Sequence, residues 1–190
     1  MTGLITSRSD DAHVKLLHDE TNEETGERVK QTEVYTFMFV TENNEFSILE
    51  FCMISSKPRS QTGQMFFCIM VERTAVGILE YGDVGVIVIL EDGTTIECTQ
   101  FSSTEDSDTP TGTFTLINIK DPDLSLQIDA LSLSIDPQKA IDTNWEKLAS
   151  TPIARIRIKG SKNTQDYIPN SEFTDFPAKN LFIEHIKALR

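Results

Sequence analysis

Basic and aliphatic side chains alternate along Ile153–Lys159, read IARIRIK, and this alternation is the clearest chemical pattern in the chain. Successive side chains of a β-strand point to opposite faces, so Arg155, Arg157 and Lys159 would share one face. Like charges two residues apart lie roughly 7 Å from each other and repel unless an anionic group faces them. We therefore predict a binding site for an anionic partner, formed by Arg155, Arg157, Lys159 and Lys162. The alternative is that acidic side chains on a neighbouring strand neutralise this face.

The histidines and acidic clusters match no catalytic or metal-binding pattern. Nucleophilic catalysis requires a base and an orienting group beside the nucleophile, and none of the three histidines lies in such a motif. The cluster at residues 105–108, read EDSD, lacks the glycine and the closing glutamate of a calcium loop. No glycine-rich loop has the spacing that holds a nucleotide phosphate. We therefore predict no catalytic residue, no metal and no cofactor.

Three cysteines, Cys52, Cys68 and Cys98, lie inside apolar runs and form no CxxC motif. Such cysteines are usually buried, reduced thiols that pack as small hydrophobic side chains. The first residues lack the cationic start and the apolar stretch of a signal peptide. No apolar run approaches the ~20 residues that cross a bilayer. These features predict a soluble, cytoplasmic protein that does not associate with membranes.

The chain is strongly acidic, and its charge is unevenly distributed. Its 190 residues include 30 acidic and 17 basic side chains, for a net charge of −13. Residues 1–136 hold 24 acidic and eight basic side chains, whereas residues 137–190 hold six and nine. Binding to DNA depends on Lys and Arg side chains that neutralise phosphates. This composition therefore predicts no binding to duplex nucleic acid, and it would suit a basic protein partner.

The basic residues of Ile153–Lys159 must be positioned by a β-sheet, and the strongest sequence evidence for that sheet is at Val84–Gln100. Asp92 and Gly93 separate two extended runs and suit a two-residue hairpin loop, because both tolerate positive φ. Such a loop would pair Ile89 with Ile96. One face of the hairpin, predicted to lie in the core, would then contain Ile87, Ile89, Ile96 and Cys98. The opposite, half-exposed face would contain Val86, Val88 and Leu90.

Three earlier runs, at residues 32–40, 46–55 and 64–73, are rich in apolar side chains on both faces. A strand buried on both faces is central in its sheet and is covered by two layers. The alternative is that a second copy of the protein supplies one of these layers. Residues 1–12 and the acidic stretch 19–28 are expected to be flexible.

Two helices are predicted in the C-terminal third. Asp136 suits the N-cap and Pro137 the first turn of a helix that ends before Pro152. Its buried stripe would contain Ile141, Trp145 and Leu148. Residues 167–176 are expected to be irregular, and a final helix over 177–190 would bury one apolar stripe. Within residues 124–135 the alternation slips by one residue, which predicts either a β-bulge or a strand that passes from one sheet to another.

Strands followed by segregated helices predict one α+β domain over residues 1–190. It would be mostly antiparallel β, with sandwich-like sheets of about eight strands and two helices. The favoured function is non-catalytic, through protein–protein interaction or assembly, including self-association as a homo-oligomer. The alternatives are an enzyme whose site assembles only in three dimensions, and an acidic inhibitor that mimics nucleic acid and masks a basic partner.

Overall fold

The structure, a computed structural model, describes residues 13–57, 64–71, 76, 84–103, 113–119, 137–170 and 176–190; for residues 100–103, 113–119 and 137–142 it describes the backbone alone. The strands are β1 Leu16–Thr21, β2 Arg28–Thr32, β3 Tyr35–Thr41, β4 Phe46–Lys57, β5 Gln64–Val71, β6 Val84–Leu90, β7 Thr95–Ser103, β8 Thr113–Ile119, β9 Ile153–Lys159 and β10 Thr164–Pro169. The helices are α3 Pro137–Ser150 and α4 Leu181–Leu189, with the short 3₁₀ helix η1 Ala178–Asn180 before α4. The predicted mostly antiparallel α+β fold with two helices is confirmed.

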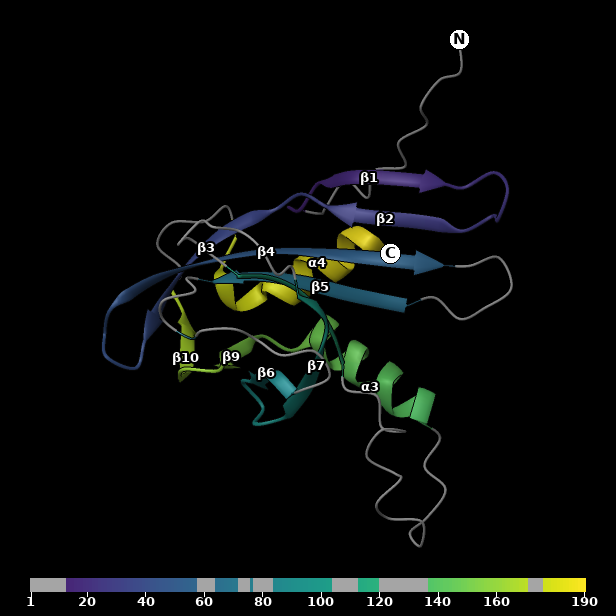
Figure 1. The fold of residues 1–190 in the computed structure, drawn as a ribbon. Coiled ribbons are helices and arrows are strands. Elements are labelled where there is room, and N and C mark those ends of the chain that lie inside the picture. The colour runs from purple at the N-terminus through teal and green to yellow at the C-terminus, as the bar shows by residue number, and fades with distance from the viewer. Residues whose placement is uncertain are drawn as a thin grey trace, which may run out of the picture.

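The ten strands form one sheet that closes on itself, in the order β1-β2-β4-β3-β10-β9-β6-β7-β8-β5, with β5 also paired to β4. Strand β4 has three neighbours, because β3 and β2 pair with successive parts of one edge while β5 pairs with the other. Figure 1 shows β3, β4 and β5 on one side of the molecule and β6, β9 and β10 on the opposite side. The layer that covers the inward faces of β3, β4 and β5 is therefore the opposite side of the same curved sheet, whereas Phe46 and Ile48 on the outward face of β4 are 67% and 57% exposed.

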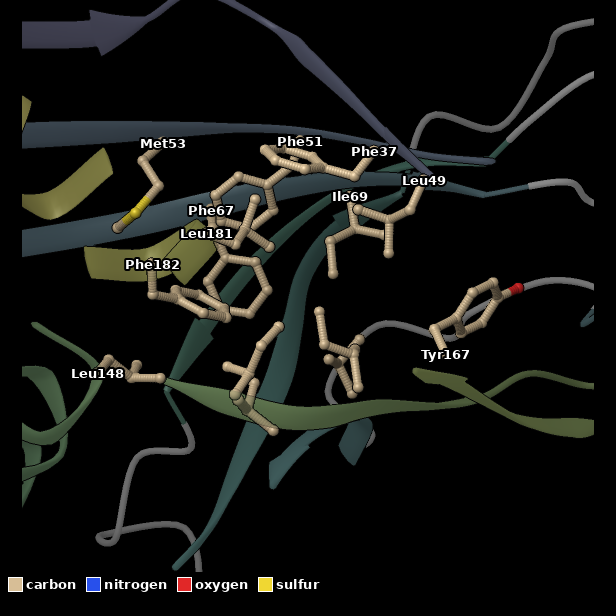
Figure 2. Close-up of a cluster of buried hydrophobic side chains, with 14 of the residues drawn as sticks. Phe37, Leu49, Phe51, Met53, Phe67, Ile69, Leu148, Tyr167, Leu181 and Phe182 are labelled. Carbon is tan, nitrogen blue, oxygen red and sulfur yellow. The ribbon is translucent and has the colours of Figure 1, made fainter. Parts of the chain in front are cut away.

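The core lies between these two sides, and α4 packs into it. Alternate residues of β4, namely Leu49, Phe51 and Met53, point inward and are at most 1% exposed. Phe51 stacks on Phe67 at 5.6 Å between ring centroids and meets Phe182 of α4 edge-on at 5.1 Å. Figure 2 shows these rings between β4, β5 and α4. Burial of each such ring contributes about 1.5–3 kcal/mol, so this cluster holds the helix against the sheet.

The apolar stripe predicted for the last helix is buried, and so are Trp145 and Leu148 of the stripe predicted for α3; the Ile141 side chain and the predicted N-cap Asp136 lie outside the described residues. In α3, Trp145 and Leu148 are 6% and 0% exposed, and the helix ends two residues before Pro152. The last helix begins as η1 and continues as α4, and its buried apolar residues are Ala178, Leu181, Phe182, Ile186 and Leu189. The Lys30 Nζ donates to the Leu189 carbonyl at 2.9 Å, which satisfies one of the carbonyls left unpaired at a helix end.

The β6–β7 hairpin has a longer loop than the predicted one. The Leu90 N–H donates to the Thr94 carbonyl at 2.9 Å, and the Gly93 N–H donates back to the Leu90 carbonyl at 3.0 Å. Gly93 has a φ of 85°, which is left-handed. This is the geometry of a three-residue loop that ends in a left-handed glycine. Ile89 therefore pairs with Thr95 rather than with Ile96.

This shift of one residue overturns the predicted faces of β6. Its core face consists of Val86, Val88 and Leu90, each at most 1% exposed. Ile87 and Ile89 instead point outward, opposite Glu97 and Thr95. The prediction is wrong because a pairing that moves by one residue exchanges the two faces of one strand. On β7 the prediction is confirmed: Ile96 and Cys98 are 1% and 0% exposed.

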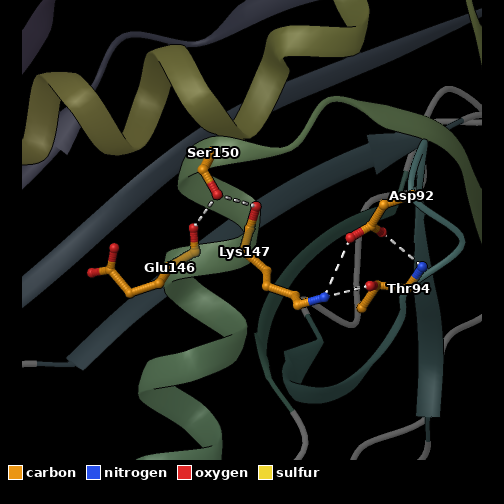
Figure 3. Close-up of polar contacts among 5 residues, drawn as sticks. All are labelled: Asp92, Thr94, Glu146, Lys147 and Ser150. Atoms are coloured by element: carbon orange, nitrogen blue, oxygen red, sulfur yellow. Dashed lines mark hydrogen bonds and ion pairs between the residues drawn. The ribbon is translucent and has the colours of Figure 1, made fainter.

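A small polar cluster joins α3 to this hairpin (Figure 3). The Lys147 Nζ donates to the Thr94 Oγ1 at 2.7 Å and lies 3.3 Å from the Asp92 Oδ2. The Asp92 Oδ1 accepts the Thr94 N–H at 2.8 Å, which closes the turn. The Ser150 Oγ donates to the Glu146 carbonyl at 2.8 Å in the last helical turn. Solvent screens an exposed ion pair of this kind, so it adds little to stability.

Two segments predicted as irregular contain strands. Strand β1 continues through Asp19, and β2 begins at Arg28, so the predicted acidic loop is a short hairpin turn. The Arg28 Nε donates to the Asp19 Oδ1 at 2.8 Å across this hairpin. Strand β10 extends to Pro169 and so includes the first three residues of the segment 167–176 that was expected to be irregular. The predictions for residues 1–12, 105–108 and 124–135 lie outside the described residues.

Candidate functional site

The cationic strand predicted from the sequence is β9, which lies between β10 and β6 in the sheet. Ile156 and Ile158 are fully buried and point inward. Arg155 and Arg157 lie on the outer face, opposite Ile89 and Ile87 of β6. The predicted alternation of this strand is therefore present, with its basic side chains on the outside of the closed sheet.

Asp166 of β10 binds both arginines. It lies directly opposite Arg157 in the antiparallel register. The Arg157 Nε and Nη2 donate to its two carboxylate oxygens at 2.6 and 2.8 Å, and the Arg155 Nη1 donates to Oδ2 at 3.0 Å. Two parallel bonds from one guanidinium are the strongest form of this pair. The Asp166 side chain is fully covered, whereas the Arg155 and Arg157 side chains are 43% and 37% exposed.

These contacts shift the proton affinities of the cluster. The Arg157 hydrogen bonds are the largest cause that lowers the pKa of Asp166 to about 2; burial opposes them, and Arg155 and the nearby Glu42 add to the decrease. The same bonds raise the pKa of Arg157. Asp166 is therefore ionised throughout the physiological range. It supplies a fixed negative charge between two partly exposed guanidinium groups.

The four predicted site residues do not form one group. Arg155 and Arg157 share the Asp166 carboxylate, as in the alternative considered from the sequence. Lys159 and Lys162 are exposed, and neither forms an ion pair with another residue in the part of the chain that the structure describes. Asp166 itself was missed because β10 was not predicted as a strand. An anionic partner at these four residues stays a prediction.

A second feature of the outer surface is a group of apolar side chains on β3, β4 and β10. The register places Phe46 opposite Val40, and Val40 opposite Ile168. Ile48 lies opposite Met38 in the next outward row. We call these five residues the outer apolar face. Phe46, Ile48 and Ile168 are 67%, 57% and 41% exposed, whereas Met38 and Val40 are half-buried between them.

Charged side chains border this face. Asp166 and Ile168 are two residues apart on β10 and therefore share the outer side of the sheet. The arginines of the neighbouring β9 lie beyond them. Exposed Glu42 and Glu45 lie at the turn between β3 and β4. Because Glu42 is close enough to affect the pKa of both Arg157 and Asp166, acidic and basic groups lie together at this border of the outer apolar face.

His185 on α4 is buried, and its surroundings give it a structural role. Its Nδ1 lies 2.8 Å from the Thr32 Oγ1, which also accepts the Met53 N–H at 2.8 Å. The rings of Tyr35 and Phe51 pack edge-on against it at 5.4 and 4.8 Å. Burial lowers the pKa of His185 to about 3. The imidazole is therefore neutral at pH 7, and it contributes to core packing.

Comparison with protein-family models, with curated proteins and with solved structures gives no match to this chain. Within the described ranges, no group of three or more His, Cys, Asp or Glu side chains could hold a metal ion. In the same ranges, no helix has the length and apolar character needed to cross a bilayer.

Proposed function

We propose that this protein acts through protein–protein association and that the outer apolar face is its contact surface. The observation that carries the proposal is the exposure of Phe46 and Ile48, side by side on β4, at 67% and 57%. Adjacent large apolar side chains on a rigid surface are characteristic of interfaces. A buried aromatic anchor often dominates the free energy of association. Phe46 is the natural anchor here because it is the most exposed member of the face.

The proposed occupant is a second copy of this chain. A two-fold interface uses the same patch on both subunits, so its charges must complement themselves. The border of the outer apolar face supports this, since it carries basic groups, Arg155 and Arg157, as well as acidic ones, Glu42 and Glu45. A patch bordered by acidic groups alone would instead favour a basic partner. Strands β3 and β4 are apolar on both faces, which suits a layer supplied by another subunit.

The net charge of −13 would oppose this association, because two like-charged molecules repel at low ionic strength. Salt screens that repulsion and does not weaken apolar contacts. We therefore expect the fraction of dimer to rise between 50 mM and 500 mM salt. Binding to a basic partner, or mimicry of nucleic acid, would show the opposite dependence on salt. Size-exclusion chromatography with light scattering at both salt concentrations distinguishes these cases.

Substitution of the proposed anchors tests the surface itself. We expect Phe46→Ser and Ile48→Ser each to weaken dimerisation about 10-fold or more, since truncation of such anchors often costs above 1 kcal/mol. Leu17→Ser is the matched control, because Leu17 on β1 is 49% exposed and lies outside the outer apolar face. It should leave the dimer unchanged. A wild-type chain that stays monomeric at several hundred micromolar in 500 mM salt would contradict the proposed occupant.

A further inference from the structure

Cys52 on β4 and Cys68 on β5 are direct partners in the antiparallel register. Both are free thiols, and each is 1% exposed. They alternate with the inward residues Phe51 and Met53, so they lie on the outer side of the sheet. We propose that this pair is a redox-modification site, at which a peroxide converts the two thiols to an intrachain disulfide. The sequence alone does not suggest this site, because 15 residues separate the two cysteines.

The geometry of the pair is compatible with a disulfide. Directly opposed residues of an antiparallel pair have Cα atoms about 4.5 or 5.5 Å apart, and both spacings fall in the range of about 4.4–6.8 Å found for disulfides. Their Cβ atoms are about 4.5–5.5 Å apart, against roughly 3.5–4.5 Å in a disulfide. Closure therefore needs the strands to approach by up to about 1 Å at this point. The register need not change, and the flanking pairs Phe51–Ile69 and Met53–Phe67 maintain it.

The two sulfurs are not equivalent. A hydrogen bond from the Cys68 thiol lowers the pKa of Cys52, although burial opposes this effect. The same interaction, together with burial, raises the pKa of Cys68. Within the proposed site we therefore assign Cys52 as the sulfur that reacts first and Cys68 as the sulfur that resolves the intermediate, an order that the single variants below test. Cys98 is different, because it lies in the core opposite Val86, and burial raises its pKa.

The reaction is a two-electron oxidation by hydrogen peroxide. The Cys52 thiolate attacks one peroxide oxygen, the O–O bond breaks, and the departing hydroxide takes up a proton to give water. The resulting sulfenic acid is attacked at sulfur by Cys68, which loses its proton as the S–S bond forms and a second water departs. In sum, two thiols and one hydrogen peroxide give one disulfide and two waters. The disulfide would covalently join β4 to β5 beneath their outer surface.

The test uses the full, reduced chain at pH 7.5, treated with hydrogen peroxide and then with catalase. Remaining thiols are labelled with N-ethylmaleimide in denaturant and counted by intact mass. We expect the label count to fall from three to one, with the remaining label on Cys98. Proteolysis should yield a peptide that links Cys52 to Cys68, and dithiothreitol should restore three labels. Cys98→Ser is the matched control and should still form the cross-link.

Single variants separate the two roles. With Cys68→Ser, we expect dimedone to trap a sulfenic acid at Cys52; Cys52→Ser should react much more slowly. The wild-type cross-link supports the proposal even if a variant folds poorly, which circular dichroism would reveal. Three results would overturn it: three labels after peroxide treatment, a disulfide between chains, or loss of Cys98 at the same rate as Cys52. None of these outcomes depends on the proposed self-association.

Discussion

Arg157 and Asp166 form a bidentate ion pair between neighbouring strands, with N···O distances of 2.6 and 2.8 Å. The carboxylate is fully covered, although both arginines that cover it remain more than one third exposed. Asp166 therefore acts as an internal counter-ion on the outer side of the sheet. It allows two adjacent arginines to occupy one strand without strong mutual repulsion.

Asp166→Asn should destabilise the protein by roughly 2 kcal/mol, because it removes charged hydrogen bonds and leaves two guanidinium groups without a counter-charge. The pKa of Asp166 in the folded protein is about 2, below the ordinary 3.8. The stabilisation that the ionised carboxylate gives the wild type is therefore fully present above about pH 3.8 and is lost as the pH falls through 2. Urea denaturation at pH 7 measures the difference. Lys162→Gln, an exposed change of one charge on the same β9–β10 connection, should shift stability by under about 0.5 kcal/mol. Equal effects of Asp166→Asn and Lys162→Gln on stability would contradict the role of Asp166 as a counter-ion.

His185 should make the protein less stable as the pH falls from 6.5 towards 3. Its folded pKa of about 3 lies below the ordinary 6.5, so the unfolded chain binds a proton in this range while the folded chain does not. Because of His185, the free energy of unfolding of the wild type should fall by roughly 3 kcal/mol between pH 7 and pH 4. Urea denaturation of His185→Asn across this range should show a correspondingly flatter profile. His18→Gln, at an exposed histidine on β1, should keep the wild-type slope.

Gly160 and Gly93 should respond differently to substitution. A Cβ at Gly160 would lie 2.1 Å from the Val76 carbonyl oxygen, which also accepts the Lys162 and Asn163 N–H groups and so cannot easily withdraw. Gly93 has open space but a left-handed φ of 85°. We expect Gly160→Ala and Gly160→Asn both to cost roughly 1–3 kcal/mol. At Gly93, Ala should cost roughly 1–2 kcal/mol, and Asn less, because Asn tolerates this conformation.

Thermal unfolding of these four variants distinguishes a steric from a conformational requirement. Rescue by Asn at Gly93 but not at Gly160 is the expected pattern. Stability of Gly160→Ala equal to that of the wild type would show that the connection between β9 and β10 can move away from Val76.

The predicted anionic partner can be tested at the basic residues themselves. Arg155 and Arg157 already face a carboxylate, so an anion would draw most of its attraction from Lys159 and Lys162. Replacement of both lysines by Gln should abolish any binding of polyphosphate measured by calorimetry in 50 mM salt. Lys57→Gln, on an exposed part of β4, is the control and should have no effect. Absence of polyphosphate binding to the wild type would contradict the predicted site.

Local sequence patterns predicted most of the strands and both helices. The alternation of β9 and the buried stripe of α4 are examples, because a side-chain period depends only on the local backbone. The β6 faces were wrong because the loop has three residues instead of two. Asp-Gly is compatible with both loops, and the difference depends on how Val86, Val88 and Leu90 pack against the opposite side of the core.

The sequence by itself determined the fold class, the acidic net charge and the cationic character of one strand, since these follow from composition and local periodicity. Only the tertiary structure decided which groups meet. The pairing of Asp166 with Arg157, of Cys52 with Cys68 and of Thr32 with His185 depends on strand order, register and helix docking. Those features arise from contacts between residues far apart in the chain, which no local pattern specifies.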